Sequence, residues 1–236
     1  MNDFYLIIED PESSAKIYLG EISLDPEERT AMLLADTHRI PKQPLLIPLI
    51  YRNPEMSDFL NLKFPLISDK LKNILDEYVT SRIFYRPVFL EYQGSYEPYY
   101  YLVPPCYEGI DFSHSDCIKD DDLPGRVKIG EGGFNLRPSM AGKDDIFRLS
   151  GLNPRQIIIT HRLKQLLTDN GVIGVRYTPT YRYQDGEKQI GSQLKATLAN
   201  ESKITNGIDE TELLRQKAQR IREAQAQAGR ARVGKR

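Results

Sequence analysis

The stretch RQIIITHRLKQLLTDNGVIGVRYTPTYRY, residues Arg155–Tyr183, repeats a pattern that occurs 92 residues earlier in the chain. Its segment ITHRLKQLL (Ile159–Leu167) aligns with ISDKLKNIL (Ile67–Leu75), and the alignment runs without a gap over 24 positions. Six of the 24 positions carry identical residues: Ile67/Ile159, Leu71/Leu163, Lys72/Lys164, Leu75/Leu167, Tyr85/Tyr177 and Pro87/Pro179. We therefore expect two related units, at about residues 64–92 and 156–184.

Each unit has the pattern of a strand, a helix and a second strand. Ser68 and Thr160 follow short apolar runs and stand where a helix N-cap belongs. Leucines and isoleucines spaced by three and four residues then predict an amphipathic helix in each unit. Asn170-Gly171 predicts a left-handed stop for the second helix. A Tyr-x-Pro strand follows each helix, and because proline cannot donate to a ladder we expect that strand at a sheet edge or at a bulge.

The rest of the chain predicts strands with few helices. Phe4–Glu9 and Lys16–Ile22 have the pattern of an opening hairpin, and Ile83–Tyr92 with Tyr96–Val103 that of a longer one. A short helix is expected at Pro26–Leu34, where the preceding Asp25 can cap it. Val127–Ile129 predicts one more strand. Prolines prevent a helix in the segment that follows the first predicted helix, and we expect it to be extended over the core: Pro41, Pro44, Pro48 and Pro54.

These elements predict an α+β fold with mixed, largely antiparallel sheets and a few short helices. We expect a single globular domain over residues 1–200. From about Asn200 the composition changes, and a capping-box pattern precedes a thin apolar stripe. Residues 201–236 are therefore predicted to be a charged helical tail, helical over 210–228 and partly disordered at the end.

Charge and composition exclude several classes of protein. The formal net charge of −1 divides into about −5 for residues 1–200 and +4 for residues 201–236. Because the predicted domain is acidic, nucleic acid is an unlikely ligand and a basic protein partner is favoured. The N-terminus lacks the pattern of a signal peptide and no apolar run reaches the length of a membrane span. The two cysteines are then expected to be reduced, in a cytoplasmic protein.

No stretch carries a convincing catalytic, cofactor or metal motif. RVKIGEGGF (Arg126–Phe134) is similar to the glycine-rich loop of protein kinases, but the companion motifs are missing and we interpret it as a turn. A zinc site would need paired ligands at short spacing, which Cys106 and Cys117 do not provide. His114 lies among serines and aspartates and is the best candidate for a catalytic group, but no nucleophile motif surrounds it. We expect a protein that is not an enzyme and that needs no cofactor.

Several stretches together suggest a family. They are SDFL (57–60), PLISDKLKNIL, RPVFL, YYYLVPP, YEGIDFSHSD, IFRL (146–149) and IIITHRLKQLL followed by NGVIGVRYTP. This succession, over roughly residues 55–183, resembles the immunity proteins of bacterial polymorphic and contact-dependent toxin systems, of the type called immunity protein eleven. Gly171, Gly174 and Pro179 match the family's late glycine–glycine–proline strand, while Thr160 replaces its helix-capping serine.

The resemblance implies a cytoplasmic protein that binds a cognate toxin and neutralises it without chemistry. If the toxin is basic, the acidic segment of residues 104–126 is the expected contact, with six acidic residues as candidates: Glu108, Asp111, Asp116, Asp120, Asp121 and Asp122. A solvated loop remains an equally good interpretation of this segment. Two other functions stay open: an enzyme working from the loop around His114, and an adaptor or assembly protein acting through its C-terminal helix.

Overall fold

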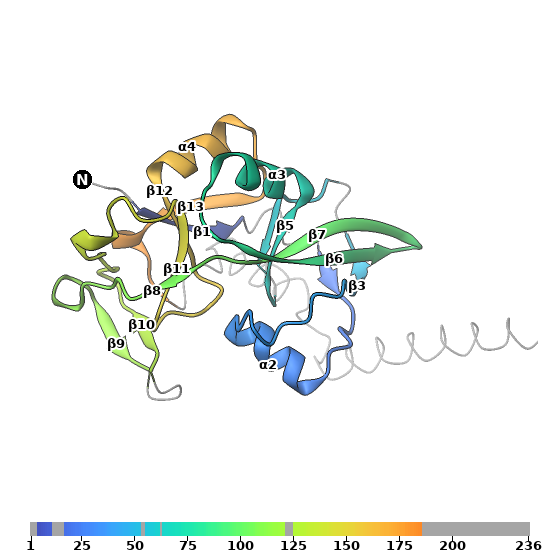
Figure 1. Cartoon of the computed structure of the whole chain (residues 1–236), viewed down its shortest axis with the longest axis horizontal. Helices are drawn as coiled ribbons and strands as arrows, with labels where there is room; N and C mark the ends of the chain where they lie inside the picture. The colour runs from blue at the N-terminus through green and yellow to red at the C-terminus, as the bar shows by residue number, and fades with distance from the viewer. Residues whose placement is uncertain (1–3, 11–16, 53–54, 62, 121–124, 186–236) are drawn as a thin grey trace, which may run out of the picture. The chain divides into compact units, whose positions relative to one another are not determined.

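The computed structural model describes residues 4–10, 17–52, 55–61, 63–120 and 125–185, which lie in one compact unit (Figure 1). The predicted helical tail and the predicted domain boundary at residue 200 lie outside the described residues. No helix among these residues is long and apolar enough to cross a membrane.

The described strands form two sheets and a separate two-stranded ribbon. The six-stranded sheet has the order β2 (Tyr18–Leu19), β3 (Leu45–Tyr51), β6 (Phe84–Tyr92), β7 (Ser95–Val103), β5 (Pro65–Ser68) and β4 (Phe59–Asn61). The five-stranded sheet has the order β13 (Val175–Pro179), β1 (Phe4–Glu9), β12 (Ile157–Thr160), β11 (Ile146–Leu149) and β8 (Cys106–Tyr107). The ribbon pairs β9 (Cys117–Lys119) with β10 (Val127–Ile129).

Three α-helices accompany these strands in the described part of the chain, together with three single turns of 3-10 helix. The α-helices are α2 (Pro26–Leu34), α3 (Asp69–Tyr78) and α4 (His161–Asp169), and the 3-10 turns are η1 (Phe112–His114), η2 (Pro138–Met140) and η3 (Thr180–Arg182). Among the named strands only the pairs β3/β6 and β8/β11 are parallel. The predicted α+β class with largely antiparallel sheets is confirmed.

The two predicted units have the same topology and the same register. In the first, β5 and β6 flank β7, and Ile67 and Pro87 both lie opposite Tyr100. In the second, β12 and β13 flank β1, where Ile159 and Pro179 both lie opposite Tyr5. Residues that are related by the 92-residue shift therefore have the same register relative to the central strand of their unit.

The equivalence extends to a strand that precedes each unit and to the start of each helix. Strand β4 pairs with β5 as β11 pairs with β12. The residue just before each of these strands is an aspartate that accepts a hydrogen bond from the N-cap hydroxyl. The Asp58 carboxylate accepts from Ser68 Oγ at 2.6 Å, and that of Asp145 accepts from Thr160 Oγ1 at 2.6 Å. Each hydroxyl in turn accepts from a first-turn backbone N–H, as predicted.

The two units pack against each other around one core. This core takes buried side chains at equivalent positions of both units, including Ile67/Ile159, Leu71/Leu163, Leu75/Leu167 and Leu102/Ile7. Helices α3 and α4 lie side by side over it (Figure 1). Lys70 of α3 donates to the Gly171 carbonyl beyond the end of α4 at 2.6 Å, and Arg162 of α4 donates to the Tyr78 carbonyl at the end of α3 at 3.4 Å. The helices thus contact each other reciprocally, the first turn of each reaching the end of the other.

The opposite face of each sheet has its own cover. Helix α2 and the segments beside it bury one face of the six-stranded sheet, and residues between β8 and β11 bury one face of the five-stranded sheet. Beneath α2 the buried Arg86 of β6 pairs with Glu28 at 2.5 Å and donates to the Gln43 carbonyl at 2.8 Å. These bonds tie α2 to the sheet.

Two sequence expectations are wrong, and both concern how strands are paired. The first two predicted strands form no hairpin, because β1 enters the five-stranded sheet while β2 pairs with β3. Pro87 does not lie in an edge strand, since β6 is between β3 and β7. The ladder with β3 begins one residue later, at Val88, so the missing N–H of Pro87 falls outside it. The expectation is right for Pro179, because β13 is an edge.

Other local predictions are confirmed. Helix α2 has the predicted bounds, and Asp25 caps it by accepting from the Glu28 N–H at 2.7 Å. The long hairpin turns at Gln93-Gly94, whose φ angles of 51° and 82° are those of a type I′ turn. The proline-rich segment is extended, although it forms strand β3 within the sheet. The GEGG sequence is a turn after β10.

Candidate functional site

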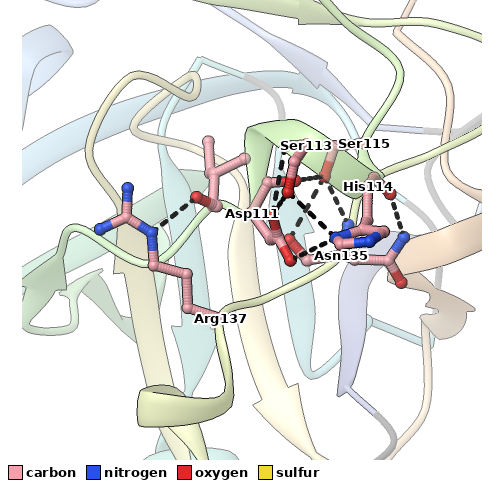
Figure 2. Close-up of polar contacts among 7 residues, drawn as sticks. Asp111, Ser113, His114, Ser115, Asn135 and Arg137 are labelled. Carbon is pink, nitrogen blue, oxygen red and sulfur yellow. Dashed lines mark hydrogen bonds and ion pairs between the residues drawn. The ribbon is translucent and has the colours of Figure 1, made fainter.

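The acidic loop predicted as a contact is held by its own polar side chains (Figure 2). Asp111 caps η1, accepting from the Ser113 N–H at 3.2 Å and from Ser113 Oγ at 2.5 Å. Ser115 Oγ accepts from the Asn135 N–H at 2.8 Å, which fastens the loop to the segment that follows the glycine turn. Hydrogen bonds from Ser113 and His114 hold the pKa of Asp111 below its ordinary value. This carboxylate therefore organises the loop.

The geometry around His114 differs from that of a Ser-His-Asp catalytic triad. His114 Nδ1 lies 2.8 Å from Asp111 Oδ2 and 3.0 Å from Ser113 Oγ, so that acid and hydroxyl meet the same ring nitrogen (Figure 2). A triad needs the acid on one nitrogen and the nucleophile on the other. The His114 side chain is also 74% exposed. The cluster has the contacts of a capping arrangement.

The other candidate acids have separate local roles. Asp116 accepts from the Gly132 N–H at 3.1 Å, and its carboxylate lies so close to Gly130 that a Cβ there would come within 2.2 Å of it. Asp120 pairs with Lys128 of β10 at 3.0 Å. Glu108 is exposed just after β8, while Asp121 and Asp122 lie outside the described residues. The four described candidates thus form no single cluster, and their role in binding stays a prediction.

The cysteines of this region lie in different sheets. Cys106 is exposed in β8 opposite Arg148, and Cys117 is half-buried in β9 opposite Ile129. Burial raises the pKa of the Cys117 thiol. Within the described ranges, no three His, Cys, Asp or Glu side chains gather in a group that could hold a metal ion.

The stretches that carry the family resemblance contact one another inside the fold. Asp58 of SDFL accepts from the Ile173 N–H at 2.9 Å. Gly174 has a φ of 76°, and a Cβ there would lie 2.2 Å from the Ser57 Cβ. Gly171, with a φ of 62°, follows the end of α4. These residues therefore have structural contacts, and a binding surface has to be sought elsewhere.

The six-stranded sheet supplies such a surface. Side chains alternate between its two faces, and the face under α3 carries Ile67, Tyr100 and Pro87. Farther along the same face, beyond α3, the register brings Leu46, Phe89 and Pro98 side by side on three neighbouring strands. We call this region the open sheet face and define it by six residues: Leu46, Pro48, Ile50, Phe89, Tyr96 and Pro98.

The open sheet face is apolar and accessible. Leu46 is 50% exposed, Ile50 71%, Phe89 39% and Tyr96 61%. Glu91 is a charged residue on the same face and lies opposite Tyr96. A contiguous group of exposed apolar side chains is typical of a surface that binds another protein.

The sequence alone did not reveal this surface. In the segment LLIPLIY both alternating sets of residues are apolar, a pattern that fits a strand covered on both faces. One set, Leu45, Ile47 and Leu49, is buried under α2, and the other is exposed. The sequence indicated that both faces of this strand are apolar, but it did not show which of them is exposed.

The comparisons with known proteins add no relative. No family model matches the chain, and a search of curated proteins found no match. The class that the structure itself defines is an α+β protein built from two related units.

Proposed function

We propose that the protein is an immunity protein, a bacterial cytoplasmic inhibitor that binds a cognate toxin and blocks it without catalysis. The class comes from the resemblance over residues 55–183. The observation that carries the proposal is the open sheet face, because an inhibitor that acts by binding needs an accessible, preformed surface of this kind.

The open sheet face has the properties of a rigid anchor. Its residues lie on β3, β6 and β7, where paired backbones fix the side-chain positions before any partner arrives. Complete burial of Leu46, Ile50 or Phe89 against a partner would each contribute about 1.5–3 kcal/mol by transfer from water. Tyr96 adds an aromatic ring, a residue type enriched at the energetic centre of interfaces.

The acidic loop has a separate, kinetic part in this proposal. Its carboxylates would attract a basic toxin and raise the association rate, whereas the apolar face would set the dissociation rate. The two surfaces therefore predict different effects on the rates. Asp116→Lys with Asp120→Lys slows association in low salt, and Phe89→Asp with Tyr96→Asp speeds dissociation.

The proposal predicts that a toxin is encoded beside the gene, and the test uses that toxin. The unmodified protein is expected to rescue cells that express this toxin, and Phe89→Asp/Tyr96→Asp is expected to lose rescue and to weaken binding by at least about a hundredfold. The matched control is Tyr78→Asp/Tyr181→Asp, which also replaces two exposed aromatic residues but lies off the open sheet face. Melting temperatures show whether each variant is folded.

These measurements test the immunity function and the contact surface separately. Loss of rescue by the first variant with retention by the control supports both. Full rescue by both variants would contradict the open sheet face as the contact. Failure of the unmodified protein to rescue, or to bind the toxin, would contradict the immunity function. Unchanged rates for Asp116→Lys/Asp120→Lys would remove the acidic loop from the interface.

A further inference from the structure

A pocket of about 610 Å³ lies between α2 and two other segments of the described chain. Arg29, Leu33 and Leu34 line it from α2, and Lys63 and Phe64 line it from the connection between β4 and β5. A third side comes from residues that precede β10 and β12: Arg126, Asn153 and Arg155. Its volume is in the range that holds a small organic ligand.

The charge of this pocket is opposite to that of the domain. Four lining residues are cationic and none is acidic: Arg29, Lys63, Arg126 and Arg155. Three acids belong to α2 and its cap: Glu28 pairs with Arg86, Asp25 caps the helix, and Glu27 is exposed and does not line the pocket. Arg155 also acts on Glu9, whose pKa it lowers against the larger effect of burial. The lining thus carries four cationic side chains and no acid.

The pocket also has an apolar side. Leu33 and Leu34 are 48% and 55% exposed, although leucines on a helix beside a core are usually covered. Both line the pocket, together with the buried Ile22 and Phe64. A ligand that fills this space would cover the leucines with an apolar or aromatic portion while its anionic group meets the cations.

We propose that this pocket binds a phosphorylated organic molecule of about the size of a nucleotide. Three of the four cations are guanidinium groups, which donate paired hydrogen bonds that match phosphate oxygens. Four positive charges favour an anion with more than one negative charge, as a phosphate ester has at neutral pH. The leucines then take the organic part. This binding site is independent of the proposed immunity function.

The probes are ADP, pyrophosphate and adenosine, titrated into the full chain by calorimetry. ADP is expected to bind best and pyrophosphate more weakly, with affinities that fall as salt rises, and adenosine is expected to show no binding. A single-stranded RNA with a 5′-phosphate is the fourth probe, because it offers the same phosphate chemistry from a polymer. Tighter binding of the RNA than of ADP would overturn the proposal of a small ligand.

Variants place the binding in the pocket. Arg29→Gln/Arg126→Gln is expected to weaken ADP and pyrophosphate by about tenfold or more, because charge-assisted hydrogen bonds are lost. Leu34→Ser is expected to weaken ADP and leave pyrophosphate unchanged. The control Arg82→Gln/Arg176→Gln removes the same charge from two exposed positions outside the pocket and is expected to bind normally. Absence of binding by ADP and pyrophosphate, or equal effects of the two double variants, would overturn the proposal.

Discussion

The two related units share a backbone plan but differ in what their polar residues contact. Asp58 in the first unit is 6% exposed and accepts from both Ser68 Oγ and the Ile173 N–H. Its equivalent Asp145 is half-buried and is paired with Arg162, which is exposed. Asp58 also pairs with Lys70, the equivalent of Arg162, at 3.4 Å, so both units have this ion pair. The units differ in the burial of the aspartate and in the added bond from Ile173 to Asp58.

A second difference concerns the tyrosines at the centre of each unit. The Tyr100 hydroxyl donates to Asp69 at 3.2 Å, and the Tyr5 hydroxyl lies 3.3 Å from His161 Nδ1. Lys72 and its equivalent Lys164 lie over these rings, at 5.2 Å and 4.2 Å from the centroids. The contact geometry is retained although the acid has become a histidine. Equivalent positions thus keep their packing more strictly than their charge.

The largest expected effect comes from the core that the units share. Leu75→Ala and Leu167→Ala remove equivalent side chains that are 1% and 0% exposed. Each is expected to lower the free energy of unfolding by about 2–5 kcal/mol, because transfer energy is lost and a cavity remains. Urea denaturation measures this loss. A single transition in each variant is expected, and two separate transitions would show that the units unfold independently.

Replacement of the equivalent aspartates should sharpen the contrast between units. Asp58→Ala leaves the Ile173 N–H and the Ser68 hydroxyl without their acceptor in a buried place, and is expected to cost about 2–3 kcal/mol. Asp145→Ala breaks a partly exposed contact and is expected to cost about 1 kcal/mol. Equal losses of the free energy of unfolding in the two variants would contradict the difference in burial.

The end of β1 should make the stability of the protein depend on pH, whereas the equivalent position just after β7 in the first unit has no titratable side chain. Glu9 ends β1, where the register of the first unit places Pro104. Burial raises the pKa of Glu9 from 4.5 to about 7, against smaller opposing effects of the Asn61 backbone hydrogen bond and Arg155. Between these values the folded chain keeps a proton that the unfolded chain loses, so this group lowers stability as pH rises through the window.

Glu9→Gln tests this effect, because glutamine stays neutral at every pH. The variant is expected to gain about 1–2 kcal/mol over the unmodified protein at pH 8 and to gain nothing at pH 4. The measurement is the free energy of unfolding of both proteins at the two pH values. The same gain at both pH values would mean that ionisation of Glu9 is not its cause.

Local sequence determined the elements of each unit. The hydroxyls of Ser68 and Thr160, the leucine spacing and the Asn-Gly stop act within a few residues of one another. They predicted the start of both helices and the end of the second, and the structure confirms these. Even the shift of 92 residues anticipated the ladder register, because each identical position has the same place in the core. The candidate acids of the loop were found by composition, a property that says nothing about partners. Asp111 and Asp120 proved to have close ones, in Ser113 and Lys128.

Strand partners and surfaces were decided only by the tertiary structure. The sequence paired β1 with its neighbour in the chain, whereas β1 lies between β12 and β13 and completes a unit whose other strands begin about 150 residues later. Long-range pairing depends on which apolar faces meet, and alternation within one strand does not record that. The same reason hid the open sheet face and the cationic pocket. Both are regions that the packing of α2, α3 and the strands leaves exposed, and this packing is a property of the folded chain.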